Sequence, residues 1–123
     1  MTQQIKIPDA EHSITFDSAA VHVVVRVGDI VIAETTDALI LREAGYPPVH
    51  YIPVEDVVPG VLRPSSSQSY CPYKGEASYY DIVLADGREF PDAVWTYRSP
   101  YLAVQAIAGR VAFYTDRVQL EAQ

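Results

Sequence analysis

The chain has 123 residues, of which 49% are hydrophobic and 20% charged, a composition typical of one folded, soluble domain rather than a disordered segment. The formal net charge of −7 and the presence of only two lysines, Lys6 and Lys74, exclude the basic surface that nucleic acids and anionic membranes require. No run approaches the roughly 18 apolar residues that a membrane-spanning helix needs.

Two features predict a cytoplasmic protein. The single cysteine, Cys71, cannot form an intramolecular disulfide, which fits a reducing compartment. Residues 1–8 lack the basic region and the apolar stretch of a secretory signal. We therefore expect one domain over residues 1–123, in which residues 1–12 form a loosely ordered N-terminal arm.

Residues 21–35 predict a first β-hairpin. Alternate valines give one strand an apolar face, and Gly28-Asp29 supplies a two-residue turn. In the predicted register Glu34 lies opposite Val23, on the inward side of the hairpin. An inward carboxylate at a strand end is either a rim residue or part of a site, and the rim is the preferred interpretation.

The next segment, residues 36–43, fits either a capped helix or a strand whose face includes Glu43. The Gly-Tyr-Pro-Pro turn at 45–48 and the extended residues 49–52 favour the strand, and therefore a second hairpin. The prolines in residues 53–60 leave room for no more than one helical turn.

Residues 63–69 contain four serines and a proline, which predicts a surface connection. A long extended run follows at residues 76–85. The Asp86-Gly87 dipeptide predicts a hairpin turn, and the returning strand places Trp95 and Tyr97 on one face.

Near the C-terminus, Ser99-Pro100 resembles a helix cap followed by proline at the first helical position, which predicts one short helix over residues 101–108. Gly109 ends it. Residues 111–114 and 117–120 then predict a terminal hairpin. Altogether the pattern indicates a mainly β, antiparallel domain.

The most distinctive stretch is Cys71-Pro72-Tyr73-Lys74-Gly75. Pro72 and Gly75 suit a β-turn, and a turn would bring the Cys71 thiol close to the Lys74 ammonium. Cys71 and Lys74 are therefore the candidate catalytic residues. The alternatives are that Cys71 is a small buried hydrophobe, which is the preferred interpretation, and that Lys74 is an exposed turn residue rather than the partner of an anionic or carbonyl group.

Aromatic residues surround this stretch, and several are expected on neighbouring strands, where they could wall a cleft or form a homodimer interface. The two interpretations carry equal weight. A carboxylate from Glu34 or Glu43 could fix a donor on the ligand. The candidate ligand-binding residues are Tyr73, Lys74, Tyr79, Trp95, Tyr97, Glu34 and Glu43.

Neither a metal nor a cofactor is expected. The histidines His12, His22 and His50 are dispersed, and the sequence contains no Cys-x-x-Cys pair. It also lacks the glycine-rich phosphate-binding loops and the Gly-x-Ser-x-Gly elbow of serine hydrolases.

An ordered set of motifs covering about residues 21–118 resembles the DUF427 family. The motifs are Tyr51-Ile52-Pro53, Glu55-Asp56-Val57, Cys71-Pro72-Tyr73-Lys74-Gly75, Ala77-Ser78-Tyr79-Tyr80, Trp95-Thr96-Tyr97 and Val111-Ala112-Phe113-Tyr114. The resemblance implies a β-tent fold of the Mss4-like kind, in which hydrophobic packing would replace the zinc of the fold's other members. It implies no activity, and these residues do not support the nucleotidyltransferase label that some classifications attach.

The sequence therefore predicts a domain that binds a small polar molecule in an aromatic cleft beside the Cys71–Gly75 turn. One alternative is an enzyme that uses Cys71 as a reactive thiolate. A second is a structural or homodimeric interaction module without catalysis.

Overall fold

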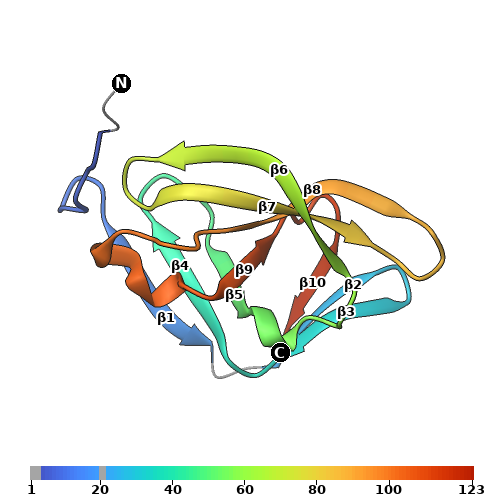
Figure 1. Cartoon of the computed structure of the whole chain (residues 1–123). Helices are drawn as coiled ribbons and strands as arrows, with labels where there is room; N and C mark the ends of the chain where they lie inside the picture. Colours follow the sequence, from blue (N-terminus) through green and yellow to red (C-terminus); the bar gives the residue numbers. More distant parts are fainter. Residues whose placement is uncertain (1–3, 20–21) are drawn as a thin grey trace.

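The computed structural model describes residues 4–19 and 22–123, and this part of the chain forms ten β-strands and two short 3₁₀ helices (Figure 1). The strands are β1 (Ile14–Ala19), β2 (Val23–Val27), β3 (Ile30–Thr35), β4 (Ala38–Glu43), β5 (Val49–Pro53), β6 (Leu62–Cys71), β7 (Gly75–Val83), β8 (Glu89–Thr96), β9 (Arg110–Phe113) and β10 (Gln119–Ala122). The 3₁₀ helices are η1 (Val54–Asp56) and η2 (Leu102–Ile107).

The strands form two antiparallel sheets, which confirms the predicted mainly β, antiparallel class. The larger sheet has the order β1-β4-β5-β9-β8-β7-β6, and the smaller has the order β10-β2-β3. Every neighbouring pair in these two orders is antiparallel. Because most connections join strands that are also neighbours in space, short turns suffice for much of the fold.

The main hydrophobic core contains residues from both sheets. Val25 and Ile32 come from the smaller sheet, whereas Ile52, Ile82 and Val94 come from the larger one, and all five are fully buried. Burying each such side chain contributes about 1.5 to 3 kcal/mol. This shared core holds the two sheets together.

A second core cluster lies within the larger sheet and beneath η2. Leu41, Tyr51 and Ala112 come from three neighbouring strands, and Val104 and Ile107 of η2 pack on them. This cluster supports the site described below.

The first hairpin has the predicted turn but not the predicted register. Val27 pairs with Ile30 across the turn, but a bulge between Val25 and Arg26 shifts the remaining pairs by one residue. Since neighbouring residues of a strand face opposite sides, the shift places Glu34 opposite Val24 and leaves it exposed. The prediction of an inward Glu34 was therefore wrong.

The second and third hairpins are confirmed. β4 and β5 pair antiparallel, so residues 36–43 contain a strand rather than a helix. η1 is a single turn, as the prolines predict. β7 and β8 pair across the Asp86-Gly87 turn, where the Gly87 amide donates a hydrogen bond to the Leu84 carbonyl.

Residues 63–69 belong to β6 and are not a surface connection, so that prediction was wrong. β6 is an edge strand of the larger sheet, a position where a proline such as Pro64 is tolerated because the strand pairs on one side only. Ser66 and Ser69 of this strand are exposed. The hydroxyls of Ser65 and Ser67 donate hydrogen bonds to the two carboxylate oxygens of Asp92, at 2.5 and 2.7 Å. A partner 25 or more residues away therefore fixes this strand.

The predicted C-terminal hairpin does not form, so that prediction was also wrong. β9 pairs with β5 and β8 in the larger sheet, whereas β10 crosses to the smaller sheet and pairs with β2. A turn in which the Arg117 amide donates to the Tyr114 carbonyl redirects the chain between the sheets.

The expected short helix lies where the sequence places it, but it is a 3₁₀ segment interrupted at Val104, whose φ of −125° and ψ of 25° are not helical. The residue at its start is Tyr101 rather than Ser99, and its side chain makes no capping hydrogen bond. Neither 3₁₀ segment in residues 4–19 and 22–123 has the length and apolar character needed to cross a bilayer.

The packing of the main core predicts the effect of truncating Ile82. Ile82→Ala removes a fully buried side chain and should lower the free energy of unfolding by about 2 to 5 kcal/mol, measured by urea denaturation. The matched control is Ile7→Ala, whose side chain is 78% exposed and which should change that free energy by less than about 0.5 kcal/mol. Equal effects of the two substitutions would contradict this description of the core.

Candidate functional site

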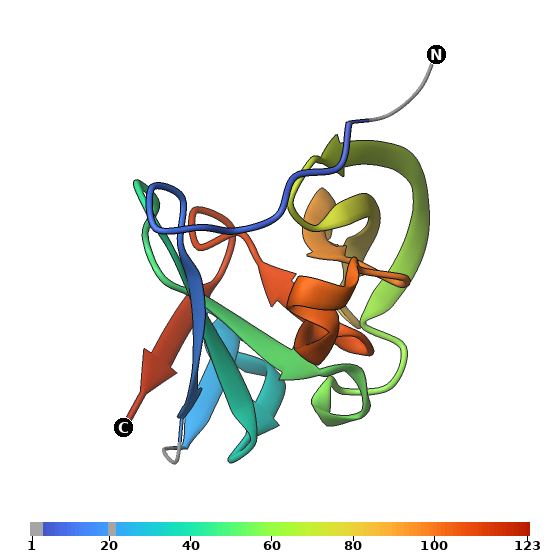
Figure 2. The ribbon, with the colours of Figure 1, turned by 90° about the vertical axis from the view of Figure 1, so that its left-hand side faces the viewer.

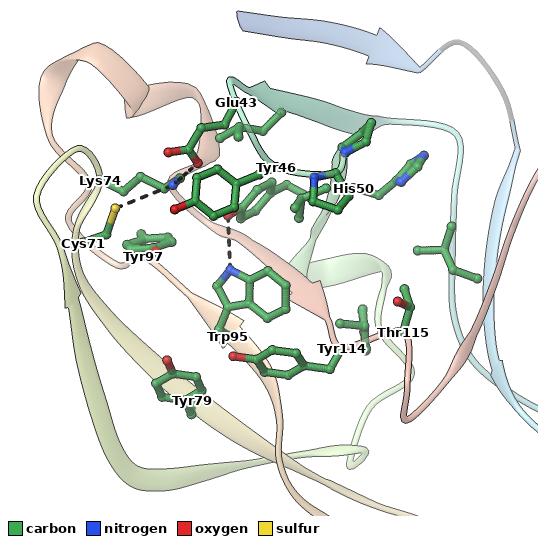
Figure 3. Close-up of a pocket in the computed structure, with 17 residues that line it drawn as sticks. Glu43, Tyr46, His50, Cys71, Lys74, Tyr79, Trp95, Tyr97, Tyr114 and Thr115 are labelled. Atoms are coloured by element: carbon green, nitrogen blue, oxygen red, sulfur yellow. Dashed lines mark hydrogen bonds and ion pairs between the residues drawn. The ribbon is translucent and has the colours of Figure 1, made fainter. Parts of the chain in front are cut away.

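A cavity of about 730 Å³ opens beside the second core cluster (Figure 3). Most of its walls come from strands that are consecutive in the larger sheet, from β4 through β5, β9, β8 and β7 to β6, and from their adjoining loops. Leu120 of β10 adds one residue from the smaller sheet. The polar and aromatic residues that line it are Glu43, Tyr46, His50, Tyr51, Cys71, Lys74, Tyr79, Trp95, Tyr97, Phe113, Tyr114 and Thr115.

Strand periodicity explains which side chains face the cavity. Leu41 and Glu43 are two residues apart at the end of β4, and Trp95 and Tyr97 are two residues apart at the end of β8. Successive side chains of a strand point to opposite faces, so Val94 enters the main core instead. The predicted pairing of Trp95 with Tyr97 on one face is confirmed.

The stretch from Cys71 to Gly75 bends as the sequence predicts. Cys71 and Gly75 are paired at the end of β6 and the start of β7, and the Lys74 amide donates a hydrogen bond to the Cys71 carbonyl at 3.2 Å. The φ of Gly75 is +112°, a value that side-chain-bearing residues rarely adopt. The Tyr101 amide donates to the Lys74 carbonyl at 3.0 Å and so anchors the turn from outside.

Within this turn the thiol and the ammonium approach each other. The Lys74 ammonium nitrogen lies 3.6 Å from the Cys71 sulfur and 2.6 Å from Glu43 Oε1. Lys74 is only 8% exposed, so the interpretation as an exposed turn residue was wrong. Cys71 is half-buried and lines the cavity, so it is not sealed in the core.

Glu43 is the counter-ion of the site. Burial alone would raise its pKa, but hydrogen bonds from Lys74 and His12 outweigh the burial, and the pKa lies below its ordinary value of 4.5. Glu43 is therefore ionised at neutral pH and cancels the charge of Lys74.

The N-terminal arm reaches this ion pair. His12 Nε2 lies 2.7 Å from Glu43 Oε2, and the His12 ring stacks on Tyr73 with ring centroids 3.9 Å apart. The Lys6 amide donates to the Pro72 carbonyl at 2.8 Å. The arm was expected to be loosely ordered over residues 1–12, of which residues 1–3 lie outside the described part of the chain. Residues 4–12 run from the β6–β7 turn to β1 (Figure 2, blue).

Sequence reasoning missed the role of His12. The Asp9 carboxylate accepts hydrogen bonds from the amides of Glu11 and His12, both at 2.9 Å, which turns the arm back toward the sheet. The Pro8-Asp9 pair is a local turn signal that could have indicated a structured arm. It could not have indicated Glu43 as the partner.

Two candidate residues do not line the cavity. Tyr73 lies under His12, with the Lys6 ammonium 5.8 Å from its ring centre, so it supports the arm rather than the cavity wall. Glu34 is exposed on the smaller sheet and pairs with His22. The structure brings the other five candidates together, namely Glu43, Lys74, Tyr79, Trp95 and Tyr97.

An aromatic wall forms the opposite side of the cavity from the ion pair (Figure 3). The Trp95 ring lies against Tyr114, with centroids 4.5 Å apart, and edge-on to Tyr51 at 6.4 Å. The Trp95 indole N–H donates to the Tyr51 hydroxyl at 3.2 Å. The Tyr79 hydroxyl forms a 2.6 Å hydrogen bond with Ser69, which fixes the orientation of that ring.

Tyr97 is a further aromatic residue of the lining. It is 8% exposed and lines the cavity, and its hydroxyl has no hydrogen-bond partner among residues 4–19 and 22–123. Burial raises its pKa, and the neighbouring Tyr51 and Cys71 raise it further. The Tyr97 hydroxyl is therefore a protonated donor directed into the cavity.

Three further titratable groups of the lining have shifted pKa values. Burial raises the pKa of Tyr51 to about 12, despite the hydrogen bond from Trp95, and burial also raises the pKa of Tyr114. Burial, reinforced by Arg42, lowers the pKa of His50 below its ordinary value of 6.5. At neutral pH these three groups are uncharged, and the ion pair described above contributes no net charge.

The described part of the chain contains no group of three or more His, Cys, Asp and Glu side chains that could hold a metal ion. What the cavity offers is a set of hydrogen-bonding groups and a thiol.

Residues 15–123 match the family model described as a domain of unknown function, DUF427. The match starts slightly earlier and ends slightly later than the motifs at 21–118. No curated protein matches the chain.

The Lys74–Glu43 pair predicts a strong effect of Glu43→Gln. This variant leaves a buried ammonium without its counter-ion and should lower the free energy of unfolding by about 3 kcal/mol at neutral pH. Because the folded pKa of Glu43 is lowered, its contribution is complete above the ordinary value of 4.5 and is lost as the pH falls through the folded pKa. The difference between wild type and variant, measured by urea denaturation, should therefore shrink in acid.

The matched control is Asp17→Asn, which breaks the exposed ion pair with Arg42 and should cost less than about 1 kcal/mol. A Glu43→Gln effect that is equally small, or that does not change with pH, would contradict the assignment of a buried pair.

Proposed function

The chain belongs to the DUF427 family, and we propose that its cavity binds a small uncharged molecule that has a planar ring and a hydrogen-bonding oxygen. The observation that carries the proposal is the Tyr97 side chain, which is mostly buried, lines the aromatic cavity and has no hydrogen-bond partner among the described residues. The Lys74–Glu43 ion pair of the same cavity carries no net charge. Because this hydroxyl of Tyr97 is accessible from the cavity, it can donate a hydrogen bond to a bound molecule. A ligand oxygen would accept that bond.

The size of the cavity supports a small ligand. Its volume of about 730 Å³ falls within the range of roughly 300 to 1,000 Å³ that small-molecule sites occupy. Such sites combine mostly apolar walls with a few convergent polar groups, and this lining has that composition.

The aromatic wall favours a planar ring. Trp95 and Tyr114 lie against each other at one side, and Tyr79 is held in place by Ser69. Fixed aromatic faces bind flat, apolar groups with little loss of side-chain entropy. Hydrogen bonds from the Tyr97 hydroxyl would then orient the ring by its oxygen substituent.

The charges favour an uncharged ligand. Lys74 was predicted to pair with an anionic or a carbonyl group, but Glu43 already neutralises its ammonium. An anionic ligand would find no net positive charge in the lining and would be repelled by a protein with a formal net charge of −7. A cationic ligand would lose its hydration shell without gaining a counter-charge, which is energetically unfavourable. A carbonyl, amide or hydroxyl oxygen fits both the ammonium and the phenol.

Tryptophan fluorescence tests this proposal, because Trp95 is the only tryptophan and lies in the cavity wall. Titration in high salt, which screens the net charge, should show that benzamide changes the fluorescence at lower concentrations than benzoate or benzylamine do. Tyr97→Phe should weaken benzamide binding about fivefold, the equivalent of one hydrogen bond of roughly 1 kcal/mol.

Tyr80→Phe is the matched control, since Tyr80 packs on the main core and does not line the cavity. It should leave benzamide binding unchanged. Benzoate binding as tight as that of benzamide, or equal effects of the two tyrosine variants, would disprove the proposed selectivity.

A further inference from the structure

We propose that Cys71 forms a reversible covalent adduct with an aromatic aldehyde bound in this cavity. The proposal rests on the proposed function, because the aldehyde is an uncharged planar molecule. Its oxygen would occupy the polar end of the cavity, which is formed by Cys71, Lys74 and Tyr97. The proposal adds a bond between the ligand and the thiol.

The polar end of the cavity places a nucleophile beside two donors. The Cys71 sulfur lies 3.6 Å from the Lys74 ammonium nitrogen, and both residues line the cavity (Figure 3). Tyr97 lies on the same side of the cavity as these two residues (Figure 3).

The position of Tyr97 supports a bound ligand independently of the Cys71 thiol. Its side chain is more than nine-tenths buried, and it has no hydrogen-bond partner among the described residues. Together with the ammonium, it can donate to an oxygen that becomes negatively charged. The arrangement has the elements of a carbonyl-addition site, which are a nucleophile and donors for the oxygen.

The addition balances without any further reactant. The sulfur of Cys71 forms a bond to the carbonyl carbon, and the π bond of the carbonyl breaks with its electron pair moving to the oxygen. Lys74 donates a proton to that oxygen and accepts the proton that leaves the thiol. The product is a thiohemiacetal, no group is oxidised or reduced, and Glu43 stays ionised throughout as the counter-ion of Lys74.

The position of the donors favours attack at the carbonyl carbon over attack at a conjugated double bond. In carbonyl addition the developing negative oxygen is attached to the carbon that the sulfur attacks, so it forms close to the sulfur. Lys74, at 3.6 Å from the sulfur, can reach that oxygen. In conjugate addition the oxygen lies two carbon atoms further from the sulfur, and therefore further from the Lys74 ammonium beside it.

The test compares benzaldehyde, labelled with an NMR-active isotope at its carbonyl carbon, with benzyl alcohol, which has the same ring and no electrophile. We expect the labelled carbon to give the signal of a tetrahedral carbon when the full-length protein is added. Cys71→Ala should abolish that signal, and Tyr97→Phe should reduce it, whereas Tyr80→Phe should leave it unchanged. Cys71 is the only cysteine, so no other thiol can contribute.

The outcomes separate the two proposals. If benzyl alcohol binds but benzaldehyde gives no tetrahedral signal, the covalent step is wrong and the neutral pocket stands. A tetrahedral signal that persists in Cys71→Ala, which has no nucleophile at this position, also overturns the covalent step, as does a trigonal imine carbon that would assign the reaction to Lys74. If neither compound binds, both proposals are wrong.

Discussion

The ion pair between Lys74 and Glu43 is the interaction on which the site depends, because it joins distant parts of the larger sheet. Glu43 ends β4, whereas Lys74 lies in the turn between β6 and β7, and three strands separate β4 from β7 in the sheet order. A contact of 2.6 Å across that separation requires the sheet to curve around the cavity. The arm reinforces this closure through His12, which binds the other oxygen of Glu43 (Figure 2).

The Lys74–Glu43 pair also determines the net charge of the cavity lining. Removing two charges from water carries a desolvation cost that is offset only when the partners are close and further hydrogen bonds satisfy their remaining atoms. Here Lys74 also contacts the Cys71 sulfur, and Glu43 also binds His12. With both charges paired, the lining offers aromatic faces and hydrogen-bond donors, among them the Tyr97 hydroxyl, which has no hydrogen-bond partner in the described part of the chain.

Features set by neighbouring residues could be predicted from the sequence. The Gly28-Asp29 and Asp86-Gly87 turns, the bend from Cys71 to Gly75 and the shared face of Trp95 and Tyr97 all follow from local backbone preferences and strand periodicity.

Features set by distant contacts could not. The bulge after Val25 moved Glu34 out of the core face, and the carboxylate of Asp92 holds the serine-rich segment as a strand. Glu43 and Lys74 were both candidates, but their separation of 31 residues gave no indication that they would pair with each other rather than with a ligand. The cytoplasmic location, the homodimer and the β-tent grouping stay predictions.

The most direct test of a neutralised Lys74 is the rate at which Cys71 is alkylated by iodoacetamide relative to iodoacetate, two reagents of similar size that differ in charge. The ratio is measured in high salt for the native protein and for the chain unfolded in urea. Because Glu43 cancels the ammonium beside the sulfur, we expect the native protein to favour the neutral iodoacetamide more strongly than the unfolded chain does. A native protein that instead favours the anionic iodoacetate would show that Lys74 acts as a free positive charge, and would contradict the neutral site.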